Sequence, residues 1–330
     1  MKQSSFNKKL RQTGVEYTHK RTMQKKHSIE ILRALCAVEV FFLHYCASHI
    51  GPETVAWFCG AVPAFLLMSA YLYGIREPQP VYGVRFFCRR WLTLGATYYP
   101  FLLCVFLVSL MSGQYPIGEL LRGLVTDMFF LVGFNSSKTL PGCGHLWFMT
   151  ILMLCYLALV VVGNNGRVRR VLRSGWGVAC AFVALLLIGF TYRGGGIPVR
   201  LFAYVVLFFN ADRLHNLVST RRRTLLTVGV ALVCYALVVM QMAEWFRYAA
   251  YLQHMATCLI GVVTIALAER YLAHVRPGRC ITFLSDISME IYLVHHLFVY
   301  DQPLYVSVPL TLVLSVVLHF ISMPRLAKGC

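Results

Sequence analysis

The stretch Ile29–Cys46, with the sequence IEILRALCAVEVFFLHYC, decides how this chain can fold. It is mostly apolar and long enough to lie in a bilayer, because about 20 helical residues cross the ~30 Å hydrocarbon layer. Yet it carries the ionisable residues Arg33, Glu39 and His44. Ionisable groups inside a membrane are costly and mostly face a cavity or a partner, so the stretch indicates a functional site.

The composition of the whole chain excludes an ordinary soluble domain. Of the 330 residues, 58% are hydrophobic and only 13% are charged, and the mean hydropathy is +0.64. Soluble domains are about one quarter charged. Lipid must therefore be the solvent for much of the surface, which predicts an all-α integral membrane protein, because a helix satisfies its own backbone hydrogen bonds in lipid.

The apolar runs predict ten transmembrane helices. They are Ile29–Ile50, Thr54–Tyr73, Trp91–Met111, His145–Val162, Trp176–Tyr192, Pro198–Asn210, Thr224–Met242, Tyr248–Ala268, Ile281–Tyr300 and Leu304–Met323. The run Pro198–Asn210 is short, and Asp286 and Glu290 interrupt Ile281–Tyr300. A further run, Gly118–Phe134, contains three charged residues and predicts an amphipathic or re-entrant segment rather than a span.

The distribution of basic residues predicts the orientation of these spans. With the N-terminus in the cytoplasm and ten alternating spans, few of the 31 Lys and Arg residues fall outside: Arg122, Lys138, Arg193, Arg200 and Arg247. The positive-inside rule describes this imbalance. We therefore expect a basic cytoplasmic tail over residues 1–28, a transmembrane domain over 29–325 and a short cytoplasmic tail over 326–330. The net charge of +18 then lies against anionic lipid rather than nucleic acid.

Two of the ionisable residues in the opening stretch share one face of their helix. Arg33 and His44 are eleven residues apart, which is about three turns and ~16 Å along the axis. Arg33 is then expected near the cytoplasmic edge and His44 toward the outer half. Glu39 points to a different side and is expected to face another helix.

Several motifs resemble those of the membrane acyltransferase 3 family, in the same order along residues 29 to 325. Arg33 and His44 resemble the R-x10-H signature of this family. Further similar segments are AFLLMSAYLYG (Ala64–Gly74), RFFCRRWLTL (Arg85–Leu94), GHLWFMTILMLCYL (Gly144–Leu157), SMEIYLVHHLFV (Ser288–Val299) and HFISMP (His319–Pro324). The sequence departs from the family pattern at Ala70, Thr93, Leu152 and Ser322.

The resemblance implies an integral-membrane acyltransferase of a bacterial cytoplasmic membrane, which transfers an acyl group, usually acetyl, to surface sugars. The donor would be acyl-CoA, used as a co-substrate rather than a bound cofactor. The acceptor would be a hydroxyl of a surface glycan or a lipid-linked sugar. The sequence itself does not identify the acceptor.

Acyl transfer to a hydroxyl requires a base and a held donor. His44 is the candidate general base, because a neutral imidazole can take the proton of the hydroxyl, and the resemblance implies the same role. Arg33 is expected to contact the donor or to orient the site. Arg85, Arg89 and Arg90 lie at the expected cytoplasmic mouth of the third span, where guanidinium groups suit the phosphates of CoA.

Other candidate residues lie on either side of this path. The hydroxyl groups of Ser69 and Tyr71 are expected near the acyl end of the donor. On the acceptor side we expect His145, Trp147 and His295, of which His295 matches the position in the family. The next residue, His296, points about 100° away on an ideal helix, so at most one of the two is expected to share a face.

Two other functional classes remain open from the sequence. A proton-coupled transporter also has buried charges and histidines, although an internal repeat is not evident. A structural or partner-binding membrane protein is the third class. A zinc site is not predicted, because the chain has no HExxH pattern and three ligands would have to come from separate helices.

Overall fold

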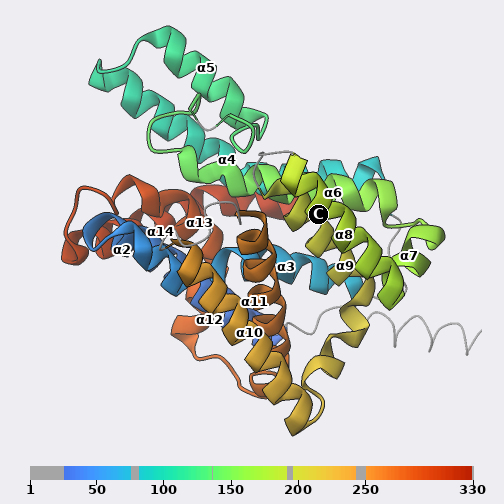
Figure 1. Ribbon diagram of the computed structural model, residues 1–330. Coiled ribbons are helices and arrows are strands. Elements are labelled where there is room, and N and C mark those ends of the chain that lie inside the picture. Colours follow the sequence, from blue (N-terminus) through green and yellow to red (C-terminus); the bar gives the residue numbers. More distant parts are fainter. Residues whose placement is uncertain (1–25, 76–81, 136, 192–195, 243–249, 329–330) are drawn as a thin grey trace, which may run out of the picture.

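The computed structural model describes residues 26–75, 82–135, 137–191, 196–242 and 250–328, and this part of the chain is helical without strands (Figure 1). Nearly all of the expected basic tail over residues 1–28 lies outside the described residues. The described elements are, in order, α2 (His27–His49), η1 (Pro52–Phe58), α3 (Ala61–Gly74), α4 (Val84–Ser112), α5 (Ile117–Met128), η2 (Gly144–Leu146), α6 (Trp147–Val162), α7 (Gly166–Arg173), α8 (Gly175–Thr191), α9 (Ile197–Asn210), η3 (Ala211–Val218), α10 (Arg221–Met242), α11 (Ala250–Tyr271), α12 (Arg279–Asp286), α13 (Ser288–Val294), η4 (His295–Leu297) and α14 (Leu304–Lys328).

In the described part of the chain, six helices are long and apolar enough to cross a membrane. They are Pro52–Gly74, Val84–Ser112, Gly144–Val162, Arg221–Met240, Leu252–Tyr271 and Leu304–Ser322. Each overlaps one of the spans predicted from the sequence. The chain is therefore a multi-pass, all-helical membrane protein, whereas the count of ten spans and the cytoplasmic position of both termini stay predictions.

Two of the four remaining predicted spans differ from a long apolar helix in identifiable ways. Helix α9 has 14 residues and is therefore only about 21 Å long. The single helix expected over Ile281–Tyr300 is wrong, because α12 ends at Asp286 and α13 begins two residues later. Beyond this break the buried Glu290 faces α14, and its Oε1 lies 2.9 Å from Nδ1 of His319.

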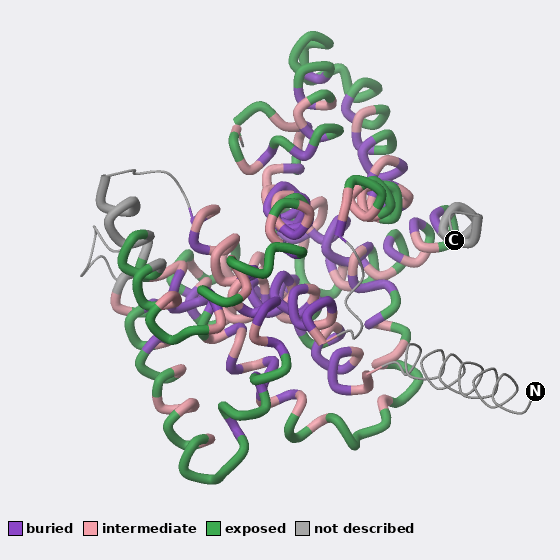
Figure 2. Tube along the Cα trace, turned by 90° about the vertical axis from the view of Figure 1, so that its right-hand side faces the viewer, coloured by how far each residue is buried: buried purple, intermediate pink, exposed green. Residues whose placement is uncertain are grey.

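Helix α3 lies at the centre of the bundle and packs against α2, α9 and α11. Ten of its 14 residues are buried, and the buried residues of the chain gather around this centre (Figure 2). The last residue of the helix is Gly74, where a Cβ atom would lie 2.2 Å from the backbone oxygen of Phe208. Only glycine allows α3 and α9 to approach this closely.

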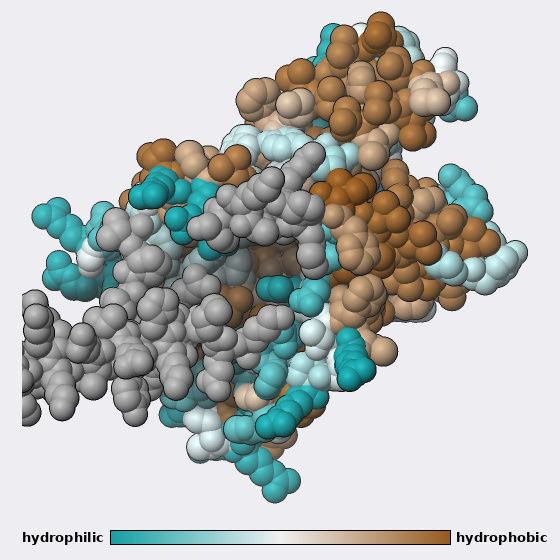
Figure 3. Space-filling model, turned by 180° about the vertical axis from the view of Figure 1, so that it is seen from behind, coloured by the Kyte–Doolittle hydropathy of each residue, from teal (hydrophilic) through white to brown (hydrophobic). Residues whose placement is uncertain are grey.

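The α4–α5 hairpin projects from the bundle (Figure 1). Helix α4 has 29 residues and is about 43 Å long, so it exceeds the ~30 Å hydrocarbon layer. Helix α5 has 12 residues, too few to span the bilayer, and occupies part of the run Gly118–Phe134. Seen from behind, the hairpin surface is strongly hydrophobic (Figure 3). This surface fits a segment that lies in lipid or in the membrane interface.

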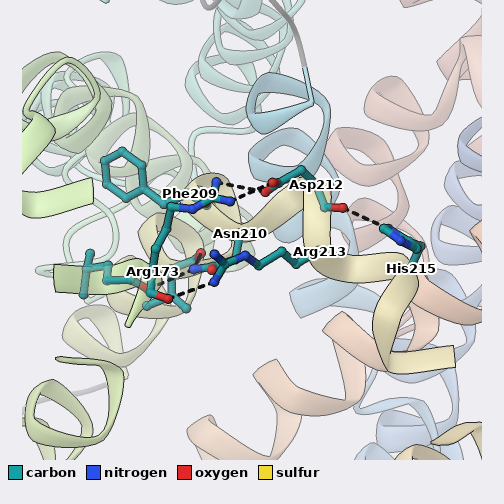
Figure 4. A network of polar contacts seen from close by, with 8 residues as sticks. Arg173, Phe209, Asn210, Asp212, Arg213 and His215 are labelled. Carbon is teal, nitrogen blue, oxygen red and sulfur yellow. Dashed lines mark hydrogen bonds and ion pairs between the residues drawn. The ribbon is translucent and has the colours of Figure 1, made fainter. Parts of the chain in front are cut away.

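A polar network fastens α7 to the junction of α9 and η3 (Figure 4). The guanidinium of Arg173 donates to both carboxyl oxygens of Asp212, at 3.1 and 2.8 Å, and also to the backbone oxygen of Phe209. Arg213 in turn donates to the backbone oxygen of Arg173 at 2.8 Å. Although partial burial raises the pKa of Asp212, the hydrogen bonds and charge of Arg173 leave this pKa below its usual value.

Candidate active site

One end of the bundle, which we call the basic end, contains the start of α2, the ends of α3 and α11 and the start of α4. Here Lys26 donates to Oε2 of Glu269 at 2.6 Å and to the hydroxyl of Tyr71 at 2.8 Å. The hydroxyls of Tyr71 and Ser28 also donate to the Glu269 carboxylate. Tyr71 thus belongs to an ion-pair network that joins α2, α3 and α11.

The three arginines at the start of α4 differ in their surroundings. Arg85 and Arg89 are exposed, whereas Arg90 is half-buried. The guanidinium carbon of Arg90 lies 5.0 Å from the ring centre of Tyr73 and 5.6 Å from that of Phe86. Its Nε atom is buried without a hydrogen-bond partner among the described residues. Arg90 is therefore the member of this group that faces the protein interior.

Ser69 lies in a cluster of tyrosines close to Arg90. Its hydroxyl donates to the Leu66 backbone oxygen at 2.8 Å and lies 3.0 Å from the hydroxyl of Tyr204. The ring of Tyr156 belongs to the same cluster, with its centre 6.1 Å from that of Tyr73. Ser69 is thus placed in the interior behind the basic end.

Helix α2 connects the basic end with the opposite end of the bundle. Eighteen residues separate Lys26 from His44, which corresponds to about 27 Å of helix. Arg33 is half-buried between them, and Ala37 and Val40 continue its stripe toward His44. Both of these apolar residues line a small pocket between α2, α3, α6 and α13. The pocket is lined by Ala37, Val40, Val62, Phe65, Phe148 and Tyr292.

The opposite end, which we call the histidine end, brings four imidazole rings together. The ring centre of His44 lies 5.1 Å from that of His295 and 4.9 Å from that of His296. The rings of His145 and His296 are stacked at 4.2 Å, and His145 is 5.2 Å from His295. Three residues singled out in the sequence, on α2, η2 and η4, therefore meet although they are far apart along the chain.

The hydrogen bonds of two of these rings fix their tautomers. Nδ1 of His295 faces the backbone oxygens of Ile291 and Tyr292, at 3.1 and 2.8 Å, so this nitrogen carries a proton. Nε2 of His295 is then a free acceptor, and it is buried without a partner in the described part of the chain. Nδ1 of His296 donates to the Gly142 backbone oxygen at 3.0 Å, so its Nε2 accepts from the hydroxyl of Tyr300 at 2.5 Å.

The expectation that at most one of His295 and His296 shares a face with the site is wrong. Helix α13 ends at Val294, and both histidines lie in the tighter 3₁₀ turn η4. Both rings consequently contact that of His44. The i, i+4 spacing of His296 and Tyr300 was a signal in the sequence, because it places two polar groups side by side on a helical turn.

Trp147 and Glu39 each face a second helix. Trp147 begins α6, and the guanidinium of Arg200 lies 4.7 Å above its ring. Glu39 faces another helix as expected, because its Oε1 lies 3.9 Å from the position that a Cβ atom would take at Gly60, just before α3. Within the described residues, no group of three or more His, Cys, Asp and Glu side chains forms a possible metal site.

The comparisons with known proteins give a single match. No curated protein and no solved structure matches the chain. A family model described as an acyltransferase domain does match. It covers residues 26–323, which include both ends of the bundle. The resemblance noted in the sequence is thereby confirmed, and the chain belongs to the acyltransferase 3 family of membrane acyltransferases.

Proposed function

We propose that the protein transfers an acyl group, expected to be acetyl, from cytoplasmic acyl-CoA to a hydroxyl of a surface glycan or lipid-linked sugar, in a bacterial cytoplasmic membrane. The observation that carries this proposal is the arrangement along α2. A half-buried arginine and an apolar pocket lie between a basic end and a cluster of four histidines. In the proposal the basic end faces the cytoplasm and the histidine end faces outward.

The basic end suits a polyanionic donor. Arg90 has a buried guanidinium nitrogen without a partner among the described residues, next to the rings of Tyr73 and Phe86. Guanidinium groups bind phosphate oxygens through two parallel N–H donors, and aromatic rings offer a face to the adenine of CoA. Arg85 and Arg89 are exposed at the same end and would attract the donor by charge.

The pocket beside α2 offers an apolar place on the way from the donor to His44. Its lining residues are all hydrophobic or aromatic, and Ala37 and Val40 share the helix face that carries Arg33 and His44. The cavity has room for only about one water molecule, so an acyl group would enter it only when the lining side chains move apart. Arg33 lies at the other side of this pocket along the stripe, where it can hold the polar part of the donor.

The histidine end can supply the proton transfers of the reaction. Nε2 of His44 or its Nδ1 accepts the proton of the acceptor hydroxyl while the oxygen attacks the thioester carbonyl. The C–S bond of the tetrahedral intermediate then breaks, and the CoA sulfur takes the proton from the His44 imidazolium. A second histidine supports this base if it accepts a hydrogen bond from the other ring nitrogen, as in Ser-His-Asp triads. His295 has the free acceptor nitrogen and lies 5.1 Å away, ring centre to ring centre.

The acceptor role of His295 leads to a testable result. His295→Asn keeps a donor near the Ile291 and Tyr292 oxygens but has no acceptor at the position of Nε2, so kcat is expected to fall about 10- to 100-fold. The KM for acyl-CoA should stay unchanged, because the donor binds elsewhere. His295→Gln places an amide oxygen near the position of Nε2 and should recover part of the lost rate. A rise in KM, or equal losses in both variants, would instead indicate a structural role.

The function itself is tested with the purified protein in lipid nanodiscs, radiolabelled acetyl-CoA and total surface glycan as acceptor pool. We expect label to enter the glycan and an equal amount of CoA thiol to appear. A transporter consumes no thioester, so thiol release separates the two classes. If a folded protein releases no thiol and transfers no label to a varied acceptor pool, the proposal is wrong.

A further inference from the structure

Arg200 forms a half-buried cationic site that the reaction described above does not use. It lies in the first turn of α9, with its guanidinium carbon 4.7 Å from the ring centre of Trp147. Nη2 donates to Nδ1 of His254 on α11, at 3.3 Å. Nε is shielded from solvent and has no hydrogen-bond partner among the described residues. Within the described part of the chain, the guanidinium therefore keeps an unused donor inside the protein.

The charge of Arg200 is not balanced by its described neighbours. Trp147 offers a ring face, and His254 must be neutral at Nδ1 because that nitrogen accepts the hydrogen bond. The ion pairs within the described residues do not include Arg200. A guanidinium whose shielded Nε–H has no acceptor is costly, and an anion that accepts from it offsets this cost.

The absence of a side chain at Gly196 leaves room for the ring of His254 beside Arg200. At Gly196, the residue before α9, a Cβ atom would lie 2.3 Å from Cδ2 of His254. The histidine that accepts from Arg200 therefore occupies the space that any larger residue at position 196 would need. This close contact holds His254 against the start of α9, so the guanidinium, the indole and the imidazole form a defined site.

The site lies at the histidine end of the bundle. Trp147 begins α6 only two residues after His145, whose ring is stacked on His296. His254 is near the start of α11, whereas Glu269 of the basic end is near the end of the same helix. Arg200 is consequently far from the expected CoA phosphates and on the side where the acceptor is expected.

We infer that Arg200 binds an anionic group of the acceptor, either the carboxylate of an acidic sugar or the phosphate of a sugar phosphate. That the bound anion belongs to the acceptor rests on the proposed function. That Arg200 binds an anion does not depend on it. Both anions accept two parallel hydrogen bonds from one guanidinium. A neutral sugar offers only hydroxyl groups and would leave the charge unbalanced. The protein thus selects acidic or phosphate-bearing acceptors.

Anion binding is measured without catalysis, as the thermal unfolding midpoint of the purified protein in nanodiscs. Sodium glucuronate and glucose 1-phosphate are expected to raise the Tm with saturation, because each binds only the folded state, whereas glucose at equal concentration should not. A response to one anion alone identifies the carboxylate or the phosphate as the ligand. Arg200→Gln should require about tenfold or more ligand for half of the shift, since it removes a charge-assisted hydrogen bond.

Three further variants make the result decisive. Arg122→Gln removes the same charge from an exposed position on α5 and should leave the response unchanged. Arg200→Lys keeps the charge and is expected to respond more weakly than the native protein. This variant covers the case that Arg200→Gln does not fold.

Glu244 lies outside the described residues. If the native protein does not respond but Glu244→Gln does, a carboxylate of the chain fills the site and the inference is wrong.

The outcomes for the site and for the reaction are separate. Thiol release together with an unchanged Tm in both anions overturns the acceptor site and leaves the acyltransferase proposal intact. A saturable shift without thiol release retains an anion site and removes the proposed reaction. An equal shift with Arg200→Gln and the native protein shows that the anions act elsewhere, which also overturns the inference.

Discussion

Replacing His44 by alanine is expected to lower acyl transfer about 100- to 10,000-fold, the usual contribution of a positioned general base. The ring of His44 is half-buried and in contact with those of His295 and His296. Its removal takes away the group proposed to accept the hydroxyl proton. The measurement is label transfer from acetyl-CoA, compared at equal amounts of protein in the membrane.

His49 provides the matched control for this variant. It lies on the same helix, five residues after His44, but its side chain is exposed and its Nδ1 lies against the Tyr45 backbone oxygen. His49→Ala removes an imidazole from the same end of α2 without touching the cluster, so we expect nearly native transfer. If His44→Ala is fully active, or if both variants lose activity equally, His44 is not the base.

The cluster itself could be predicted only in part from the sequence. The spacing of Arg33 and His44 follows from helix geometry, and the structure retains both on one stripe of α2. That His145 and His295 meet His44 depends on how η2 and η4 lie against α2, which no local pattern specifies. His296 was missed because an ideal helix was assumed, whereas the chain tightens into a 3₁₀ turn at this point.

The hydrogen-bond partners of Tyr71 and Ser69 could not be predicted from the sequence either. The sequence singled out Tyr71 for its hydroxyl, but its partners Lys26 and Glu269 come from positions 45 residues before and 198 residues after it. Ser69 was expected near the acyl end of the donor, and its observed neighbours are tyrosines behind the basic end. Residue type marked both positions as unusual, while the contacts depend on tertiary structure.

The helix count illustrates why hydropathy alone is insufficient here. Length and composition identify six helices in the described residues that can span a bilayer. The run Ile281–Tyr300 has suitable length, yet its helix breaks at Ile287 and places Glu290 against His319. A short helix such as α9 can lie at membrane depth when its neighbours cover it. Hydropathy measures the average over a window, so it does not detect either feature.

The arginines at the start of α4 yield the second large effect. Arg90→Ala is expected to raise the KM for acyl-CoA about 10- to 100-fold, the range for loss of a hydrogen bond to a charged group. The reason is that Arg90 faces inward over Tyr73, with a buried Nε that has no partner among the described residues. In the proposal this nitrogen donates to a phosphate of CoA. The kcat at saturating donor should change little, because the chemistry takes place at the other end of α2.

Arg89→Ala is the control that separates recognition from membrane topology. Arg89 precedes Arg90 on the same turn of α4 and is exposed, so its loss should raise the KM less than about fivefold, as for other exposed charges. Arg90→Lys keeps the charge but not the planar fork, and we expect an intermediate KM. Equal effects of Arg89→Ala and Arg90→Ala would mean that these arginines act only through the net charge of this face. A specific loss with Arg90 alone requires a donor site inside the mouth of α4, since both variants remove one positive charge from the same turn.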